Sequence, residues 1–161
     1  MTEVVPFSRS HQAAVIDLIL SIQRDEFGVA ITVEDQPDLR DIPRFYQQGG
    51  GNFWVAIATG EVVGTIALRD IGNRQGALRK MFVKPAYRGK EQGVAQRLFD
   101  ELIASATRAG IREVFLGTID RFVAAHRFYE RNGFVQVPEA TLPKAFPLMG
   151  VDTRFYHRKL G

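Results

Sequence analysis

A basic loop containing two glycines connects one apolar segment to the next. Residues 84–95 read KPAYRGKEQGVA, and residues 71–90 contain six Lys or Arg and no acidic residue. If a helix begins near Gly93, its first backbone amides lack partners and its dipole directs positive charge at the loop. Such a junction is typical of a phosphate site, although turn glycines on a solvated basic face would give the same pattern. The loop has neither the Gly-Lys-Ser/Thr ending of a P-loop nor the Gly-x-Gly-x-x-Gly dinucleotide pattern.

A second segment that could carry chemistry, residues 124–134, reads AAHRFYERNGF. Small residues followed by an aromatic pair would let a narrow ligand pack closely against a helix. Tyr129 would then hold a hydroxyl beside that ligand. The same aromatic pair also suits a helix packed into the core, so the residues alone leave both interpretations open.

Few other side chains are available for catalysis. The chain has no cysteine, which excludes disulfides, thiol nucleophiles and zinc sites built on thiolates. Its three histidines, at positions 11, 126 and 157, lack the paired spacing of a helical metal site, so we expect no metal. His126 stands beside Arg127 and is expected at the surface. Chemistry must therefore come from hydroxyls, carboxylates or the backbone.

The elements that position these segments follow from apolar periodicity and turn residues. We expect strands at residues 4–7, 52–59, 62–70, 77–83, 113–116, 134–137 and 153–159, and helices at 12–24, 93–109 and 122–131. Residues 25–51 are broken by two prolines and predict one or two short helices, and Gly60-Glu61 predicts a two-residue turn. Strands grouped early and then alternating with helices indicate an α/β fold with a mixed, mainly antiparallel sheet.

Length and composition predict one soluble domain spanning residues 1–161. The chain is 45% hydrophobic and 24% charged, and no apolar run approaches the roughly 20 residues of a membrane span. Residues 1–10 lack the pattern of a secretory signal, so a cytoplasmic protein is expected, without membrane or nucleic-acid partners. Residues 1–70 carry five basic and ten acidic residues, and residues 71–161 carry sixteen and eight.

Together and in this order, the two segments resemble the GNAT family of N-acetyltransferases, which transfer an acetyl group from acetyl-CoA to an amine. The resemblance spans nearly the whole chain and is strongest over residues 78–134. It implies a single-domain α/β fold whose mixed, mainly antiparallel central sheet is flanked by helices and has splayed central strands. It also implies acetyl-CoA as the cosubstrate.

The resemblance implies roles for individual residues. The N–H of Met81 would face the thioester carbonyl, the strand edge at Val83 would pair with the pantetheine arm, and Tyr129 would protonate the departing CoA thiolate. Residues implied in cofactor binding are Met81, Phe82, Val83, Arg88, Gly89, Lys90, Glu91, Gln92, Gly93, Val94, Ala95, Ala125 and Phe128.

The sequence also departs from the family pattern. Lys90 replaces the Arg or Gln at the first loop position, and Phe122 replaces an Asn that binds the pantetheine arm in many members. Ala77 stands where histone-acetylating members carry a glutamate base, which disfavours a histone-type mechanism.

The acceptor is expected to be a small amino-acid-like or polyamine-like primary amine. The acidic first half would attract a cationic amine, while Arg79 or Lys80 could hold a carboxylate; strand alternation predicts that only one of them faces the site. Glu26 is the preferred proton acceptor, with Asp25, Glu34, Asp35 or a water chain as alternatives.

Two further alternatives remain open. The apolar loop 138–152, which includes Phe146, could close over the amine, or it could pack as a hairpin loop or form a homodimer contact. The whole chain could instead be a non-catalytic acetyl-CoA sensor in which Tyr129 is retained for packing.

Overall fold

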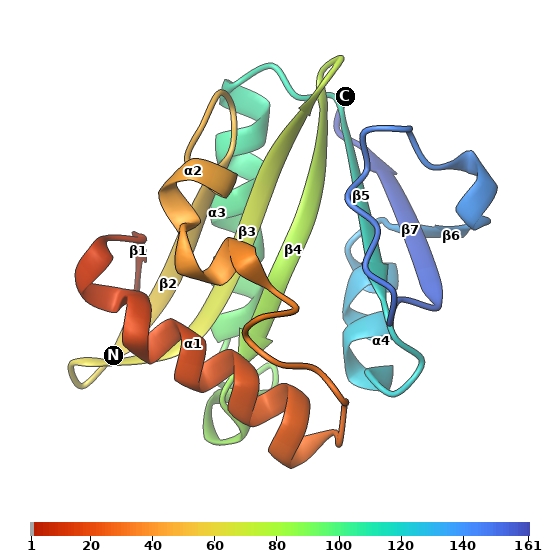
Figure 1. Cartoon of the computed structure of the whole chain (residues 1–161). Coiled ribbons are helices and arrows are strands. Elements are labelled where there is room, and N and C mark those ends of the chain that lie inside the picture. Colours follow the sequence, from red (N-terminus) through yellow and green to blue (C-terminus); the bar gives the residue numbers. More distant parts are fainter. Residues whose placement is uncertain (1) are drawn as a thin grey trace.

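A mixed seven-stranded sheet organises the chain in the computed structural model, which describes residues 2–161 (Figure 1). The strand order is β1-β2-β3-β4-β5-β7-β6, and every neighbouring pair is antiparallel except the parallel pair β4–β5. The strands are β1 (Thr2–Pro6), β2 (Asn52–Ala58), β3 (Glu61–Gly72), β4 (Gln75–Val83), β5 (Glu113–Thr118), β6 (Val135–Val137) and β7 (Arg154–Lys159). The expected α/β fold with a mainly antiparallel sheet is confirmed.

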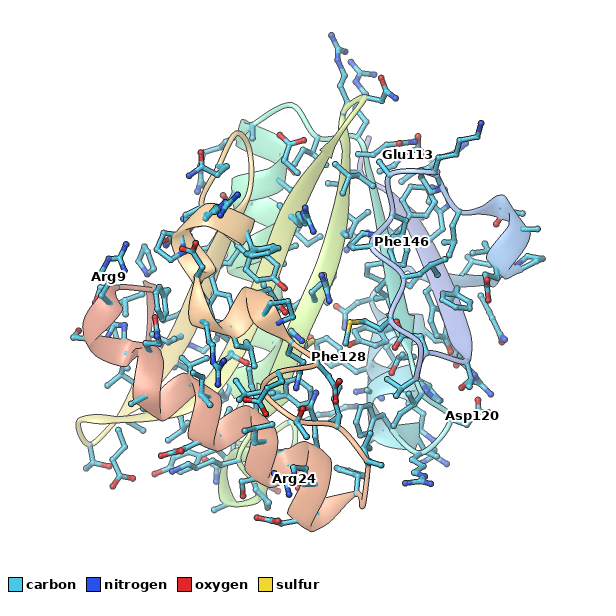
Figure 2. All side chains as sticks on the ribbon, in the orientation of Figure 1. Arg9, Arg24, Glu113, Asp120, Phe128 and Phe146 are labelled. Carbon is cyan, nitrogen blue, oxygen red and sulfur yellow. The ribbon has the colours of Figure 1, made fainter. Side chains whose placement is uncertain are left out.

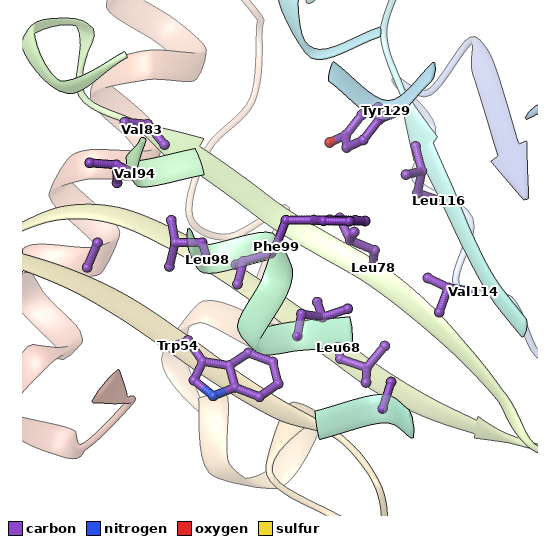
Figure 3. Close-up of a cluster of buried hydrophobic side chains, with 14 of the residues drawn as sticks. Trp54, Leu68, Leu78, Val83, Val94, Leu98, Phe99, Val114, Leu116 and Tyr129 are labelled. Carbon is purple, nitrogen blue, oxygen red and sulfur yellow. The ribbon is translucent and has the colours of Figure 1, made fainter. Parts of the chain in front are cut away.

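Helices cover both faces of this sheet. The four α-helices are α1 (Gln12–Leu20), α2 (Ile42–Tyr46), α3 (Val94–Arg108) and α4 (Val123–Arg131). In Figure 1, α1 and α2 lie in front of the sheet and α3 lies behind it. The apolar face of α3 is buried at Leu98, Phe99 and Leu102, and the first two are labelled in Figure 3. Each such side chain contributes roughly 1.5–3 kcal/mol by leaving water.

The sheet is split between its two parallel strands. β4 and β5 pair only where Gln75–Ala77 lie beside Glu113–Phe115. Beyond these residues β4 continues along β3 and β5 continues along β7, so their facing edges diverge (Figure 1). The expected splayed central strands are therefore confirmed, and backbone N–H and C=O groups on these edges are free to bind a ligand.

Several local expectations need correction. The turn between β2 and β3 is Thr59-Gly60, because Glu61 already pairs with Ala58, and both turn residues have positive φ as a hairpin turn of this length requires. The first helix is α-helical only to Leu20 and continues as a π-helical turn over Ser21–Glu26. The short helices expected in residues 25–51 are present at Pro37–Arg40 and in α2.

Candidate active site

A cleft of about 780 Å³ opens where β4 and β5 diverge. Its walls come from β4, β5, α4, the loop before α3, the end of the first helix and the loop before β7. Most of the predicted site residues line it: Arg79, Lys80, Met81, Phe82, Val83, Arg88, Gly89, Lys90, Gly93, Ala95, Ala125, Phe128, Tyr129 and Phe146. Glu26, Glu91, Gln92 and Val94 do not line it, and the side chain of Val94 is packed in the core.

The N-terminus of α3 forms one end of this cleft. Gly89 and Gly93 have φ values of 100° and 67°, and nothing lies within 4 Å of a Cβ added at Gly89. Gly93 donates its N–H to the carbonyl of Gly89, and the first intrahelical bond runs from the Arg97 N–H to Gly93. The amides of residues 94–96 therefore have no partner within the helix. This open, positively polarised turn fits the diphosphate of a nucleotide-like cosubstrate.

Arg88 and Glu26 form an ion pair at the edge of this turn. The guanidinium donates to the two carboxylate oxygens of Glu26 at 2.5 and 2.6 Å and to the Val83 carbonyl at 2.8 Å. The pair joins the end of the first helix to the loop before α3. The structure therefore does not bring Glu26 to the reacting centre, contrary to its expected role as the base, because its carboxylate is held by Arg88.

Tyr129 of α4 lines the cleft. Its ring packs against Phe134 and Tyr156, and within residues 2–161 its hydroxyl has no hydrogen-bond partner. Figure 3 shows the ring beside β5 with its oxygen pointing away from Leu116. Burial raises the pKa of the Tyr129 hydroxyl, and the nearby Asp152 and Tyr156 raise it further. The hydroxyl therefore remains protonated and available as a hydrogen-bond donor.

A β-bulge shapes the β4 wall of the cleft. Thr65 of β3 pairs with Phe82 and Ala67 pairs with Arg79, so Lys80 and Met81 oppose one residue of β3. Lys80 has a φ of 54°, and its carbonyl accepts a hydrogen bond from Thr65 Oγ1 at 2.6 Å. The expectation that only Arg79 or Lys80 faces the site is wrong, because the bulge interrupts the alternation and both line the cleft.

Lys80 is held in a buried polar network that the sequence analysis missed. Its ammonium donates to Gln36 Oε1 at 2.5 Å and lies 3.6 Å from Asp38 Oδ2, which accepts a 2.5 Å hydrogen bond from Tyr46. Gln23 and Gln36 exchange two further hydrogen bonds. Burial lowers the pKa of Lys80 to about 8, although Asp38 opposes this shift.

Arg79 presents a different environment. Its guanidinium lies over the Tyr46 ring, 6.0 Å from the centroid, and makes no ion pair or hydrogen bond within residues 2–161. Arg79 also lines the cleft. The arginine is therefore a free cation in the cleft, whereas the neighbouring Lys80 is already engaged.

The opposite wall contains a carboxylate that the sequence analysis did not identify. Asp152, at the end of the loop before β7, lines the cleft. Burial raises the pKa of Asp152 to about 6, although the cations Arg79 and Lys80 and the backbone of Met149 act in the opposite direction. In the sequence, the only feature that drew attention to loop 138–152 is its apolar character. That feature does not indicate that Asp152 lies in the cleft.

Aromatic residues close the remaining sides. Phe122 packs edge-on against Phe27 with ring centroids 4.7 Å apart, and Arg121 donates to the carbonyls of Phe27 and Gly28. Phe146 lies beside β5 in Figure 2 and packs with Phe155, so it lines the cleft and also contributes to a small core.

The expectation that His126 lies at the surface is wrong. Its ring is buried on the core side of α4, and its Nε2 lies 2.9 Å from the Ile119 carbonyl. No helix in residues 2–161 is both long and apolar enough to cross a membrane. In the same range no three His, Cys, Asp or Glu side chains gather in a metal-ligating group.

Comparisons with known proteins point to one family. Residues 16–134 match the model of the acetyltransferase (GNAT) family. An acetyltransferase of the GNAT family from Staphylococcus aureus Mu50 is 40% identical, with a TM-score of 0.96 over 100% of both chains. The PaiA N-acetyltransferase of Thermoplasma acidophilum, solved with coenzyme A, is 18% identical and shares the fold with a TM-score of 0.74 over 99% of both chains.

Among curated relatives, N-acetylaspartate synthetase of Xenopus tropicalis is 39% identical over 104 residues. The match covers 62% of this chain and 37% of the relative, so the chain spans well under half of that protein's length.

Proposed function

Because the chain belongs to the acetyltransferase (GNAT) family, we propose that it acetylates the primary amine of a small, carboxylate-bearing acceptor of the amino-acid type. Acetyl-CoA is the cosubstrate of this family. The free guanidinium of Arg79 in the cleft carries the proposal, because it is placed to pair with an acceptor carboxylate. A relative named for N-acetylaspartate, the acetylated form of an amino acid with two carboxylates, supports the same acceptor class.

The chain's own groups fit acetyl-CoA, which supplies the acetyl group as an activated thioester. The amides at the start of α3 would hold the diphosphate, with Lys90 adding positive charge. The unpaired edge of β4 at Phe82 and Val83 would bind the pantetheine arm as a neighbouring strand does. Ala125 and Phe128 of α4 line the opposite side.

Two groups would act on the reacting atoms. The Met81 N–H belongs to the bulge and would stabilise negative charge on the thioester oxygen as the amine attacks. Tyr129 would donate its hydroxyl proton to the departing sulfur. The raised pKa of Tyr129 supports this role, because the group remains a donor over the working pH range.

The proposal is tested by measuring CoA release with matched pairs of amines. Each pair comprises an amino acid and its decarboxylated amine, for example L-aspartate and β-alanine, L-glutamate and 4-aminobutyrate, and glycine and methylamine, with spermidine as a polyamine. We expect faster release with the member that carries more carboxylates. The proposal fails if no amine supports release while acetyl-CoA still raises the melting temperature, which would indicate the sensor alternative. Preferential turnover of spermidine would contradict the acceptor class.

Arg79→Gln provides the second arm of this test. Losing a charged hydrogen bond worth about 1.5–3 kcal/mol should raise KM for the carboxylate-bearing amine roughly 10- to 100-fold and leave KM for acetyl-CoA nearly unchanged. Arg74→Gln is the matched control, because Arg74 is an exposed arginine in the turn at the far end of the same hairpin. Equal small effects of both variants would show that Arg79 is not a binding residue.

A further inference from the structure

Asp152 lies on the β5 side of the split sheet, in close contact with a glycine. A Cβ added to Gly117 of β5 would lie 2.5 Å from Asp152 Oδ2 and 3.1 Å from its Cγ. Only a residue without a side chain therefore leaves room for the carboxylate at this position. The β5 edge at Gly117 lies beyond the last residue that pairs with β4. The carboxylate thus lies over the part of β5 that does not pair with β4, and both Gly117 and Asp152 line the cleft.

The charges around this carboxylate are arranged on opposite sides of the cleft. Arg79 and Lys80 of β4 are the cations that act on Asp152, and Tyr129 of α4 is the hydroxyl on which Asp152 acts. Lys80 is already bonded to Gln36 and near Asp38, whereas Arg79 is free. The cleft therefore offers a cation for a carboxylate and an anion for an ammonium, which is the charge pattern of an α-amino acid.

We infer that Asp152 is a catalytic residue: it binds the ammonium group of the acceptor and accepts the proton that this group must lose before it can attack. The inference rests on the proposed function and supplies the base that the sequence analysis had sought at Glu26. Asp152 lines the same cleft as Tyr129, while Glu26 does not line it and its carboxylate is bound to Arg88.

The proton balance of this step is complete. Asp152 takes one proton from the ammonium, and the freed nitrogen lone pair forms the bond to the acetyl carbonyl carbon. As the carbon–sulfur bond breaks, Tyr129 gives a proton to the sulfur, and the second proton lost by the nitrogen restores the Tyr129 hydroxyl. The proton on Asp152 then passes to solvent. The products are the amide, the CoA thiol and one proton.

The environment of Asp152 supports this role. Burial raises the pKa of its carboxyl to about 6, against the opposing effect of Arg79 and Lys80. The group is therefore ionised near neutral pH, yet it is more basic than an exposed aspartate. Lys80, whose pKa is lowered to about 8, is the other group in this part of the cleft that titrates near neutrality. Ionisation of Lys80 would affect the alkaline limb of a pH–rate profile, whereas ionisation of Asp152 would determine the acid limb.

The test compares Asp152→Asn with Glu139→Gln, an exposed carboxylate at the start of the same loop. We expect Asp152→Asn to lower kcat/KM for the best carboxylate-bearing amine by roughly 10²–10⁴-fold and to remove the acid limb near pH 6. Glu139→Gln should retain both the wild-type kcat/KM and the acid limb of the pH–rate profile. Acetyl-CoA binding, measured as a shift in melting temperature, should be the same in all three proteins.

A second acceptor separates deprotonation from general damage to the site. Aminooxyacetate carries a carboxylate and an amine that is already neutral at pH 7, so it does not need a base before attack. Its turnover should fall far less in Asp152→Asn than turnover of the amino acid. Equal losses of turnover with both acceptors in Asp152→Asn, or an unchanged acid limb of its pH–rate profile, would overturn the inference. As long as the wild-type protein turns over the amino acid, the proposed function would still stand. Absence of turnover by the wild-type protein would instead reject the proposed function.

Discussion

The two ends of the cleft present different chemical groups, backbone amides at one end and side chains at the other. At the cofactor end, the contacts come from one short stretch of backbone, the turn at Gly89–Gly93 and the first amides of α3. At the acceptor end they come from side chains of distant segments, namely Arg79 and Lys80 of β4 and Asp152 of the loop before β7. Backbone amides keep their charge distribution at every pH, whereas the buried acid and amine do not. The comparison therefore predicts that pH controls acceptor chemistry more than cofactor binding.

Tyr129 also lines the cleft, and loss of its hydroxyl should have the largest effect. Tyr129→Phe deletes only the hydroxyl and retains the ring packed against Phe134 and Tyr156. We expect kcat to fall by roughly 10²–10⁴-fold, with acetyl-CoA binding and melting temperature close to wild type. Tyr156→Phe is the control, because that hydroxyl donates to Glu130 and does not line the cleft. A wild-type kcat in Tyr129→Phe, with chemistry rate-limiting, would make Tyr129 a packing residue.

Gly93→Glu should abolish acetyl-CoA binding without changing the acceptor end of the cleft. Wild-type protein with acetyl-CoA at about 100 times Kd should gain about 2.7 kcal/mol in free energy of unfolding, and the variant should gain none. A carboxylate would lie where the diphosphate approaches. Gly110→Glu controls for backbone strain, because Gly110 also has a positive φ, 81°, and follows the opposite end of α3. If Gly110→Glu lost the stabilisation equally, strain rather than the phosphate site would explain the result.

Asp152 should make folding stability depend on pH. Its folded-state pKa, about 6, lies above the value of about 3.9 for an unfolded chain, so the folded protein binds the proton more tightly. Protonation of Asp152 therefore stabilises the folded protein, and this stabilisation is complete below about pH 4 and is lost as pH rises through 6. Relative to Asp152→Asn, wild-type free energy of unfolding should fall by about 2 kcal/mol between pH 4 and 7.5. Parallel pH curves for the two proteins would show that Asp152 is not perturbed by burial.

Glu26→Gln should have the smallest effect. The Arg88–Glu26 pair is partly exposed, and such pairs contribute about 0–1 kcal/mol to stability. We expect a melting temperature near wild type, kcat within about twofold of wild type, and equal or tighter binding of acetyl-CoA as Arg88 is released. A drop in kcat as large as that of Asp152→Asn would return the role of base to Glu26.

Local sequence determined the cofactor end. The glycines of the loop, the helix that follows it and the Phe128-Tyr129 pair all lie within contiguous segments, and their backbone conformations follow from residue type and spacing. The fold class was predictable for the same reason, because apolar periodicity sets most strands and helices. Gly93 and Tyr129 both line the cleft, and their chemical roles remain predictions.

Only the tertiary structure decided the acceptor end. Lys80 and Gln36 are 44 residues apart in the chain, Asp38 lies beside the same ammonium, and Asp152 reaches the cleft from the loop before β7. The bulge at Lys80 interrupts strand alternation, so that both Arg79 and Lys80 line the cleft. The buried ring of His126 bonds to a carbonyl outside its own helix. No local pattern encodes these contacts, because they depend on which strands pair, where pairing stops and which loops return to the opening.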